Sequence, residues 1–146
     1  MESTLQLRPA TTHDAEFVDQ LTRTTMGTYV EVTWPDEEAR EHYYRINRFE
    51  CPKTRIICRG GQRVGRLTLT HREGSLFIDN MHVIPEAQGK GIGTWLLEQV
   101  IRDAREKKLA VTLTVLKTNP ARRLYERLGF QVYGEKNRRL QMRLVV

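Results

Sequence analysis

The stretch 76–94 reads LFIDNMHVIPEAQGKGIGT, and the rest of the chain can be placed around it. Its first part, Leu76–Ile84, is rich in apolar residues and is predicted to form a strand that ends at Pro85. Its last part, Gln88–Thr94, has three glycines at alternate positions. This part leads into a helix predicted over Gly91–Leu109, which carries a broad apolar stripe. A strand therefore runs through a glycine-rich loop directly into the N-terminus of a helix.

This glycine-rich loop is predicted to bind an anion. Glycines let the backbone approach a ligand closely, and a helix N-terminus adds unpaired N–H groups and the positive end of the helix dipole. Phosphate suits such a cradle best, and Lys90 adds a positive charge at its rim. The loop reads GxGxG, so it is neither a GxGxxG fingerprint nor a P-loop. A tight turn that needs glycine only for packing is the alternative, and the loop alone leaves both interpretations open.

The segments before this stretch are predicted from capping residues and apolar periodicity. A short strand over Thr4–Arg8 is followed by a helix that opens at Thr12–Asp14. The segment Thr24–Trp34 is ambiguous, and Gly27 is expected to interrupt it. Proline and three acidic residues then predict a second helix, from Pro35 to about Phe49.

The remaining segments predict the fold class. Glycine turns separate several β-branched runs, and one further helix is expected over Asn119–Leu128, ended by Gly129. The predicted strands are Thr54–Arg59, Arg63–Thr70, Leu76–Ile84, Ala110–Leu116, Phe130–Tyr133 and Arg138–Val146, the last two joined by a turn at Gly134. The order β-α-α-β-β-β-α-β-α-β-β predicts an α/β (α+β) fold, in which helices flank a mixed, mostly antiparallel sheet with a right-handed parallel crossover.

Composition and charge disfavour several classes of protein. The 146 residues suit one domain, expected over 1–146. A formal charge of +6 favours anionic partners, but the arginines are scattered without a nucleic-acid-binding motif, which disfavours DNA or RNA. The chain has no apolar run long enough for a membrane helix, and no secretory signal is expected from its first residues. Cys51 and Cys58 form no CxxC pair, so no disulfide scaffold and no metal are expected, and a reducing cytoplasm is the predicted location.

A second motif, after the strand Ala110–Leu116, identifies a family. It comprises Asn119, then Tyr125 six residues on, then Gly129-Phe130. With Gln88, Gly91 and Gly93, which fit the pattern [RQ]-x-x-G-x-[GA], the sequence resembles the GCN5-related N-acetyltransferase (GNAT) superfamily. The resemblance is close from Leu76 to Gly134, and the order of elements extends it over the chain.

The resemblance implies that acetyl-CoA, or another short acyl-CoA, is a co-substrate. In that family the loop binds its pyrophosphate, which here falls on Gln88, Gly89, Lys90, Gly91, Ile92, Gly93 and Thr94. The strand before the loop pairs with the pantetheine arm and holds the oxyanion, which falls on Met81, His82 and Val83. The family's Asn on the cofactor arm corresponds to Asn119, and its Tyr that protonates the departing thiolate corresponds to Tyr125. Arg122 and its neighbour Arg123 are either phosphate ligands or a solvated helix face.

The general base is not given by the resemblance. The positions where many members carry a glutamate hold Phe77 and Thr114 here. Glu31 is the preferred replacement and Asp79 the second, with solvated or ion-paired roles as their alternatives. His82 has a suitable ordinary pKa and is expected on the opposite strand face from Asp79, because their separation is odd; a hydrogen-bonded structural histidine is its alternative.

The acceptor site is expected between the first two helices. There Tyr29, Glu31 and Trp34 form an aromatic–acidic–aromatic sequence that suits a cationic amine. The expected function is therefore transfer of an acetyl group to a primary amine of a small molecule or peptide, by direct attack. A non-catalytic acyl-CoA-binding regulatory module on the same fold is the alternative. No membrane partner is expected, and the chain is expected to be a monomer or a homodimer, paired through Leu140–Val146.

Overall fold

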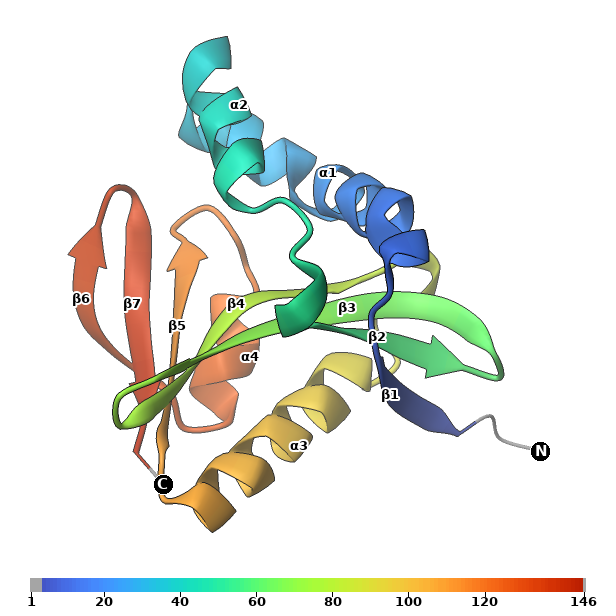
Figure 1. The fold of residues 1–146 in the computed structure, drawn as a ribbon. Helices are drawn as coiled ribbons and strands as arrows, with labels where there is room; N and C mark the ends of the chain where they lie inside the picture. The colour runs from blue at the N-terminus through green and yellow to red at the C-terminus, as the bar shows by residue number, and fades with distance from the viewer. Residues whose placement is uncertain (1–3, 146) are drawn as a thin grey trace.

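A computed structural model describes residues 4–145, and its strands form one seven-stranded sheet in the order β1-β2-β3-β4-β5-β7-β6 (Figure 1). The strands are β1 (Leu5–Pro9), β2 (Thr54–Arg59), β3 (Gln62–Arg72), β4 (Ser75–Val83), β5 (Ala110–Leu116), β6 (Gln131–Lys136) and β7 (Arg139–Leu144). Only β4 and β5 pair in parallel, and the other neighbours in the described sheet are antiparallel. The predicted fold class and element order are confirmed. The predicted last strand reached Val146, which lies outside the described residues.

The helices lie on both faces of this sheet (Figure 1). They are α1 (Ala15–Thr33), α2 (Glu37–Ile46), α3 (Ile92–Lys107) and α4 (Arg122–Arg127). Helices α1 and α2 cover one face, and α3 and α4 cover the other. Among the described residues, no helix is long and apolar enough to cross a membrane.

The prediction that Gly27 interrupts the segment Thr24–Trp34 is wrong. Helix α1 runs without a break from Ala15 to Thr33, because its second half packs Met26 and Val30 against Tyr43 of α2 and Leu116 of β5. A glycine inside a helix costs only about 1 kcal/mol relative to alanine, which this burial outweighs. The segment that was ambiguous from the sequence, Thr24–Trp34, is therefore helical up to Thr33.

The turn between β6 and β7 also differs from the prediction. Gly134 lies inside β6, next to an irregularity in its pairing with β7. The turn itself is Asn137-Arg138, where both residues have positive φ angles of 50° and 63°. Two consecutive left-handed residues are typical of a type I′ hairpin turn, which asparagine tolerates well. The residue that indicates this turn in the sequence is therefore Asn137, not Gly134.

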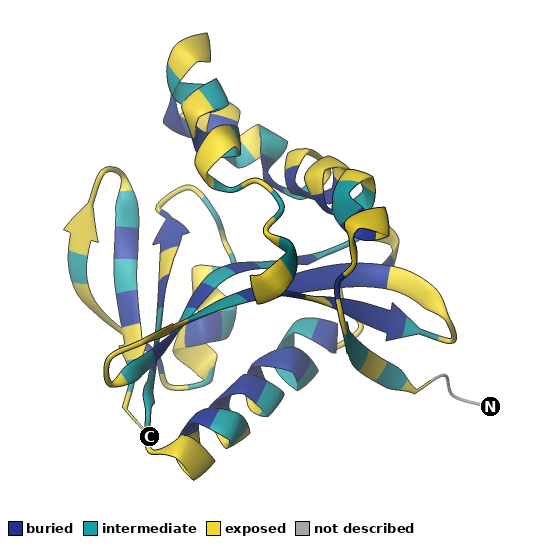
Figure 2. Cartoon of the chain, viewed as in Figure 1, coloured by how far each residue is buried: buried dark blue, intermediate teal, exposed yellow. Residues whose placement is uncertain are grey.

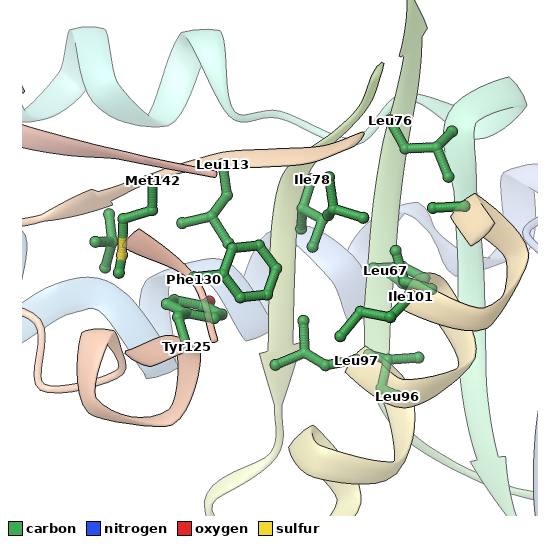
Figure 3. Packing of buried hydrophobic residues seen from close by; sticks show 14 of the residues in the cluster. Leu67, Leu76, Ile78, Leu96, Leu97, Ile101, Leu113, Tyr125, Phe130 and Met142 are labelled. Atoms are coloured by element: carbon green, nitrogen blue, oxygen red, sulfur yellow. The ribbon is translucent and has the colours of Figure 1, made fainter. Parts of the chain in front are cut away.

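The main core lies between the sheet and α3. Leucines and isoleucines of β3 and β4 pack against the apolar stripe of α3 (Figure 3), and the outward side of this helix is exposed (Figure 2). The labelled residues are Leu67, Leu76, Ile78, Leu96, Leu97, Ile101, Leu113, Tyr125, Phe130 and Met142. This core fixes the crossover from β4 through the glycine-rich loop and α3 to β5.

Strands β4 and β5 pair only over half of their length. Their register runs from Ser75↔Ala110 to Ile78↔Leu113 and stops there. Beyond Ile78, β4 stays paired with β3 up to Val83, and β5 stays paired with β7. The two strands therefore separate in the middle of the sheet.

A β-bulge lies at the point where β4 leaves β5. Leu69 of β3 pairs with Ile78, but the preceding Thr68 pairs with Asn80, so Asp79 is an extra residue in β4. A bulge changes which face the side chains take. Asp79 accepts a hydrogen bond from Thr70, which shares a face of β3 with Thr68 and Arg66, and His82 accepts one from Arg66. The prediction that Asp79 and His82 lie on opposite faces is therefore wrong, because the bulge breaks the simple alternation.

Gly65 in β3 allows a test of how closely this strand approaches β4, and Gly27 in α1 serves as the control. A Cβ atom at Gly65 of β3 would lie 2.5 Å from the carbonyl oxygen of His82, whereas a Cβ at Gly27 would meet nothing within 4 Å. We predict that Gly65→Ala lowers the free energy of unfolding by about 1–3 kcal/mol, while Gly27→Ala raises it by about 0.5–1 kcal/mol. Urea denaturation measures both; equal effects of the two substitutions would contradict the close approach of β3 to β4.

Candidate functional site

The glycine-rich loop presents a row of unpaired backbone donors. Gly89 and Gly91 have φ angles of 75° and 81°, and Gly91 precedes the first turn of α3 without any side-chain cap. The first N–H of this turn to bond within the helix is that of Trp95, which donates to the Gly91 carbonyl at 3.0 Å. Within the described chain, the backbone N–H groups of residues 89–94 donate to no protein acceptor. Six donors at the positive end of a helix favour an anion.

The glycines of the loop have two different roles. Gly89 and Gly91 need glycine for their positive φ angles, and a Cβ there would meet nothing within 4 Å. At Gly93, a Cβ would lie 3.1 Å from the side chain of Leu124 in α4. Gly93 therefore lets α3 and α4 approach each other. The two interpretations of the loop, ligand approach and packing, apply to different glycines.

A groove of about 490 Å³ lies beside this loop. Its walls are the loop, the end of β4, the start of α4 and the α1 residues Thr25, Met26 and Tyr29. The predicted residues that it brings together are Met81, His82, Val83, Gln88, Gly89, Gly91, Ile92, Gly93, Thr94 and Asn119. The structure therefore joins both sequence motifs in one groove.

Two of the predicted phosphate ligands do not line this groove. Lys90 is exposed outside it, and Arg122 pairs with Glu126 on the outer side of α4 at 3.3 Å. The groove is lined instead by Arg123 and Arg127. Arg127 was missed in the sequence analysis, although its spacing of four from Arg123 places both on one helix face.

Asn119 has a local structural role in addition to its place in the groove. Its Oδ1 accepts a hydrogen bond of 2.9 Å from the backbone N–H of Ala121, at the start of α4. Its Nδ2 lies 3.8 Å from the sulfur of Met26 in α1. The side chain therefore helps to fix α4, which carries Tyr125, against the groove.

A second, smaller cavity of about 110 Å³ lies where β4 and β5 separate. Asp79, Tyr125 and His82 all contribute to its lining, and His82 also lines the groove. Met26, Met81, Asn119 and Ala121 also line both spaces, so the groove and the inner cavity lie side by side. We refer to this smaller space as the inner cavity.

Tyr125 contributes a protonated hydroxyl to the inner cavity. The residue is 7% exposed, and its ring packs edge-on to Phe130 at 5.9 Å (Figure 3). Its hydroxyl makes no hydrogen bond within the described residues, although it lines a cavity. Burial, with a smaller effect from Tyr43, raises the pKa of Tyr125 to about 12. The hydroxyl therefore acts as a hydrogen-bond donor throughout the neutral range.

Of the two proposed acidic bases, only Asp79 lies at the inner cavity. Its Oδ2 accepts a hydrogen bond of 2.6 Å from Thr70 Oγ1, and its Oδ1 makes no hydrogen bond within the described residues. Glu31 is exposed on α1 and lines neither the groove nor the inner cavity. Since α1 is helical, Glu31 points away from the two aromatic residues: Tyr29 and Trp34 both pack at the cluster between α1 and α2, and Tyr29 also lines the groove.

His82 is held as a neutral side chain by Arg66. The Nε–H of Arg66 donates to His82 Nδ1 at 3.3 Å, and because a guanidinium has only donors, Nδ1 carries no proton. The proton of the neutral imidazole is then on Nε2. Burial, together with the Arg66 charge, holds the pKa of His82 well below its ordinary value of 6.5. Its only free nitrogen is a donor, so His82 does not act as a base.

Arg66 itself is a fully buried cation with neutral partners. Besides His82, its N–H groups donate to Thr68 Oγ1, Thr22 Oγ1 and the Asn47 carbonyl. Burial lowers the pKa of Arg66 to about 10, so it stays charged at neutral pH. This hydrogen-bonded layer joins β3 and β4 to α1 and to the segment after α2, and it was not predicted from the sequence.

The chain is similar to known acetyltransferases. A family model described as the acetyltransferase (GNAT) family matches residues 16–130. A curated relative named 5-NmdU N-acetyltransferase, from Pseudomonas phage PaMx11, is 46% identical over 54 residues, and this match spans 36% of the chain and 37% of the relative.

Solved structures share the fold over nearly the whole chain. The PaiA N-acetyltransferase from Thermoplasma acidophilum, solved in complex with coenzyme A, has a TM-score of 0.79 at 17% identity and covers 98% of this chain and 99% of its own. YjaB from Escherichia coli, solved in its apo form, has a TM-score of 0.76 at 19% identity and covers 98% of each chain.

The state of His82 gives a prediction about pH. The unfolded chain takes up a proton on this residue below about pH 6.5, whereas the folded protein does not. Stability is therefore fully present above about pH 6.5 and falls as the pH decreases, by at most about 1.4 kcal/mol per pH unit. We predict that His82→Gln removes this part of the pH dependence of the unfolding free energy between pH 7 and 5. ¹⁵N NMR of the native protein should show a proton on Nε2; an imidazole that titrates near pH 6.5 would contradict the Arg66 contact.

Proposed function

The chain belongs to the acetyltransferase (GNAT) family, and we propose that it transfers the acetyl group of acetyl-CoA, or of another short acyl-CoA, to a primary amine. The observation that supports the proposal is that the groove and the inner cavity lie side by side. The unpaired N–H groups of residues 89–94 lie beside a groove, and this groove shares Met81, His82 and Asn119 with the lining of the inner cavity. A phosphate cradle thus lies close to a proton donor, Tyr125, and a carboxylate, Asp79.

The groove suits the donor substrate in charge and shape. The N–H groups of residues 89–94 bind the pyrophosphate, and Arg123 and Arg127 line the same groove with positive charge. The residues Met81–Val83 lie where β4 has no β5 partner. Backbone groups at such an open edge bind an extended chain as another strand would, which suits the pantetheine arm.

Each residue of the inner cavity has a separate role in the proposed reaction. The neutral amine attacks the thioester carbonyl, a C–N bond forms, and the C–S bond breaks. Asp79 takes the proton that the amine loses, directly or through water. A backbone amide in Met81–Val83 and the Nε2–H of His82 stabilise the oxyanion. Tyr125 gives its proton to the departing thiolate.

The pKa of Tyr125 affects this last step. A phenol with a pKa raised to about 12 is a weaker acid than the thiol that leaves, whose ordinary pKa is about 8.5. Tyr125 therefore stabilises the developing sulfur charge by hydrogen bonding before the proton moves. A hydroxyl that is always protonated at neutral pH serves this role.

The acceptor is a primary amine of a small molecule or a peptide. The named relative makes 5-NmdU one candidate to include among the acceptors tested. A non-catalytic acyl-CoA-binding module is the second candidate function, because Phe77 and Thr114 occupy positions where many family members carry a glutamate. The position of Asp79 at the inner cavity supports the enzyme over this alternative.

Substitutions at the inner cavity test this proposal. With acetyl-CoA and a panel of amines that includes 5-NmdU, the purified protein should release free thiol. We predict that Asp79→Asn lowers kcat by about 10²–10⁴-fold and that Tyr125→Phe lowers it by about tenfold or more, both with little change in the KM for acetyl-CoA.

Glu31→Gln is the matched control for the choice of base. The Glu31 side chain is exposed away from both spaces, so this variant should keep kcat within about twofold of the native value. Binding of acetyl-CoA without thiol release from any amine would favour the non-catalytic module. Loss of turnover in Glu31→Gln but not in Asp79→Asn would overturn the assignment of the base.

A further inference from the structure

Arg139, the first residue of β7, lies between the inner cavity and a second cavity. It lines the inner cavity together with Asp79 and Tyr125. It also lines an outer cavity of about 440 Å³, which is bounded by α2 and the β6–β7 turn. Tyr43 is the other residue that lines both spaces. Arg139 and Tyr43 therefore form the wall between the two cavities.

Two aromatic rings hold the Arg139 side chain in place. Its guanidinium carbon lies 5.2 Å from the ring centroid of Trp34 and 5.7 Å from that of Tyr43, and both rings are buried. Stacking against aromatic faces orients a guanidinium without using its N–H donors. The orientation of this cation is therefore fixed by the protein.

The donors of Arg139 are almost all unused. Its single hydrogen bond within the described residues goes from Nη1 to the carbonyl of Asn137, at 3.2 Å, and no described carboxylate lies within ion-pair distance of it. By contrast, Arg122 pairs with Glu126. A half-buried guanidinium without an anion is costly and becomes favourable when a carboxylate or phosphate binds both arms of its fork.

The inner and outer cavities differ in the charged residues that line them. Asp79 is the one carboxylate among the described residues that line the inner cavity, and Arg139 is its one cation. The acidic groups of the outer cavity, Asp36 and Glu38, are exposed, and Asp36 caps α2 by accepting from the N–H of Ala39. An acceptor in the inner cavity thus has a carboxylate available to its amine and a guanidinium available to an acidic group.

We propose that Arg139 is a specificity-determining residue that binds an acidic group of the acceptor, so that the preferred substrates are primary amines that also carry a carboxylate or a phosphate. The amine end then faces Asp79 and the acidic end faces Arg139. This inference rests on the proposed acetyl transfer, because it assigns the acceptor of the same reaction.

Matched acceptors of similar length test the inference. The probes are β-alanine with a carboxylate, O-phosphoethanolamine with a phosphate, and propylamine and ethanolamine as their neutral counterparts. We expect kcat/KM of the native protein to be at least tenfold higher for one anionic amine than for its neutral counterpart. The carboxylate and phosphate arms of the series show which acidic group is preferred.

Substitution of Arg139 should abolish this preference. Arg139→Gln should bring each anionic and neutral pair to within about twofold, mainly through a higher KM for the anionic amine. Arg139→Lys, which keeps the charge but loses the fork, should retain part of the preference. Arg143→Gln is the control, since Arg143 lies on the same strand and stacks over Tyr133, away from both cavities; it should leave the preference unchanged.

A binding measurement keeps the test independent of turnover. In ¹⁵N NMR spectra of the native protein with coenzyme A, β-alanine or O-phosphoethanolamine should shift the Nε–H signal of Arg139, and propylamine should not. Equal kcat/KM values for anionic and neutral amines would overturn the inference while the acetyl transfer stands. Absence of thiol release from every amine would overturn the proposed function, and an Arg139 signal that moves with no anionic amine would overturn the anion site.

Discussion

The separation of β4 from β5 is the constraint on which the candidate site depends. Parallel pairing stops at Ile78 and Leu113, yet each strand remains bonded to its other neighbour, β4 to β3 and β5 to β7. The sheet can therefore open in its middle without leaving either strand unsupported. Below the opening, the core against α3 fixes the crossover (Figure 3), and this crossover carries the glycine-rich loop to the edge of the groove.

Two cations near the candidate site, Arg66 and Arg139, lower the free energy of unfolding in a way that a purely structural role does not explain. Arg66 is fully buried with neutral partners, and Arg139 is half-buried without a counter-ion among the described residues. Buried charges of this kind are usually paired or replaced by apolar residues. Arg66 orients His82, and in the proposed reaction Arg139 orients the acceptor, so the proposal gives both cations a role in the site.

The sequence predicted those parts of the fold that local patterns determine. Strand β2, strand β5 and the helix after the glycine-rich loop follow directly from apolar runs and from the glycines that end them. The two sequence motifs also identified residues that line one groove in the structure, such as Gln88 and Asn119. The continuity of α1 through Gly27 could not be predicted, because it depends on packing against α2 and β5. The bulge at Asp79 left no local signal, since it arises from the pairing of β4 with β3. The choice between Glu31 and Asp79 as base depends on both of these features.

The central claim is that the backbone N–H groups of residues 89–94 bind the pyrophosphate of an acyl-CoA. Amide chemical shifts of the ¹⁵N-labelled protein, followed as coenzyme A is added to saturation, test this claim most directly. Large shifts are expected for residues 89–94 and for Met81–Val83, and small shifts at the far end of α3 near Lys107. Unchanged signals at residues 89–94 under saturating coenzyme A would contradict it.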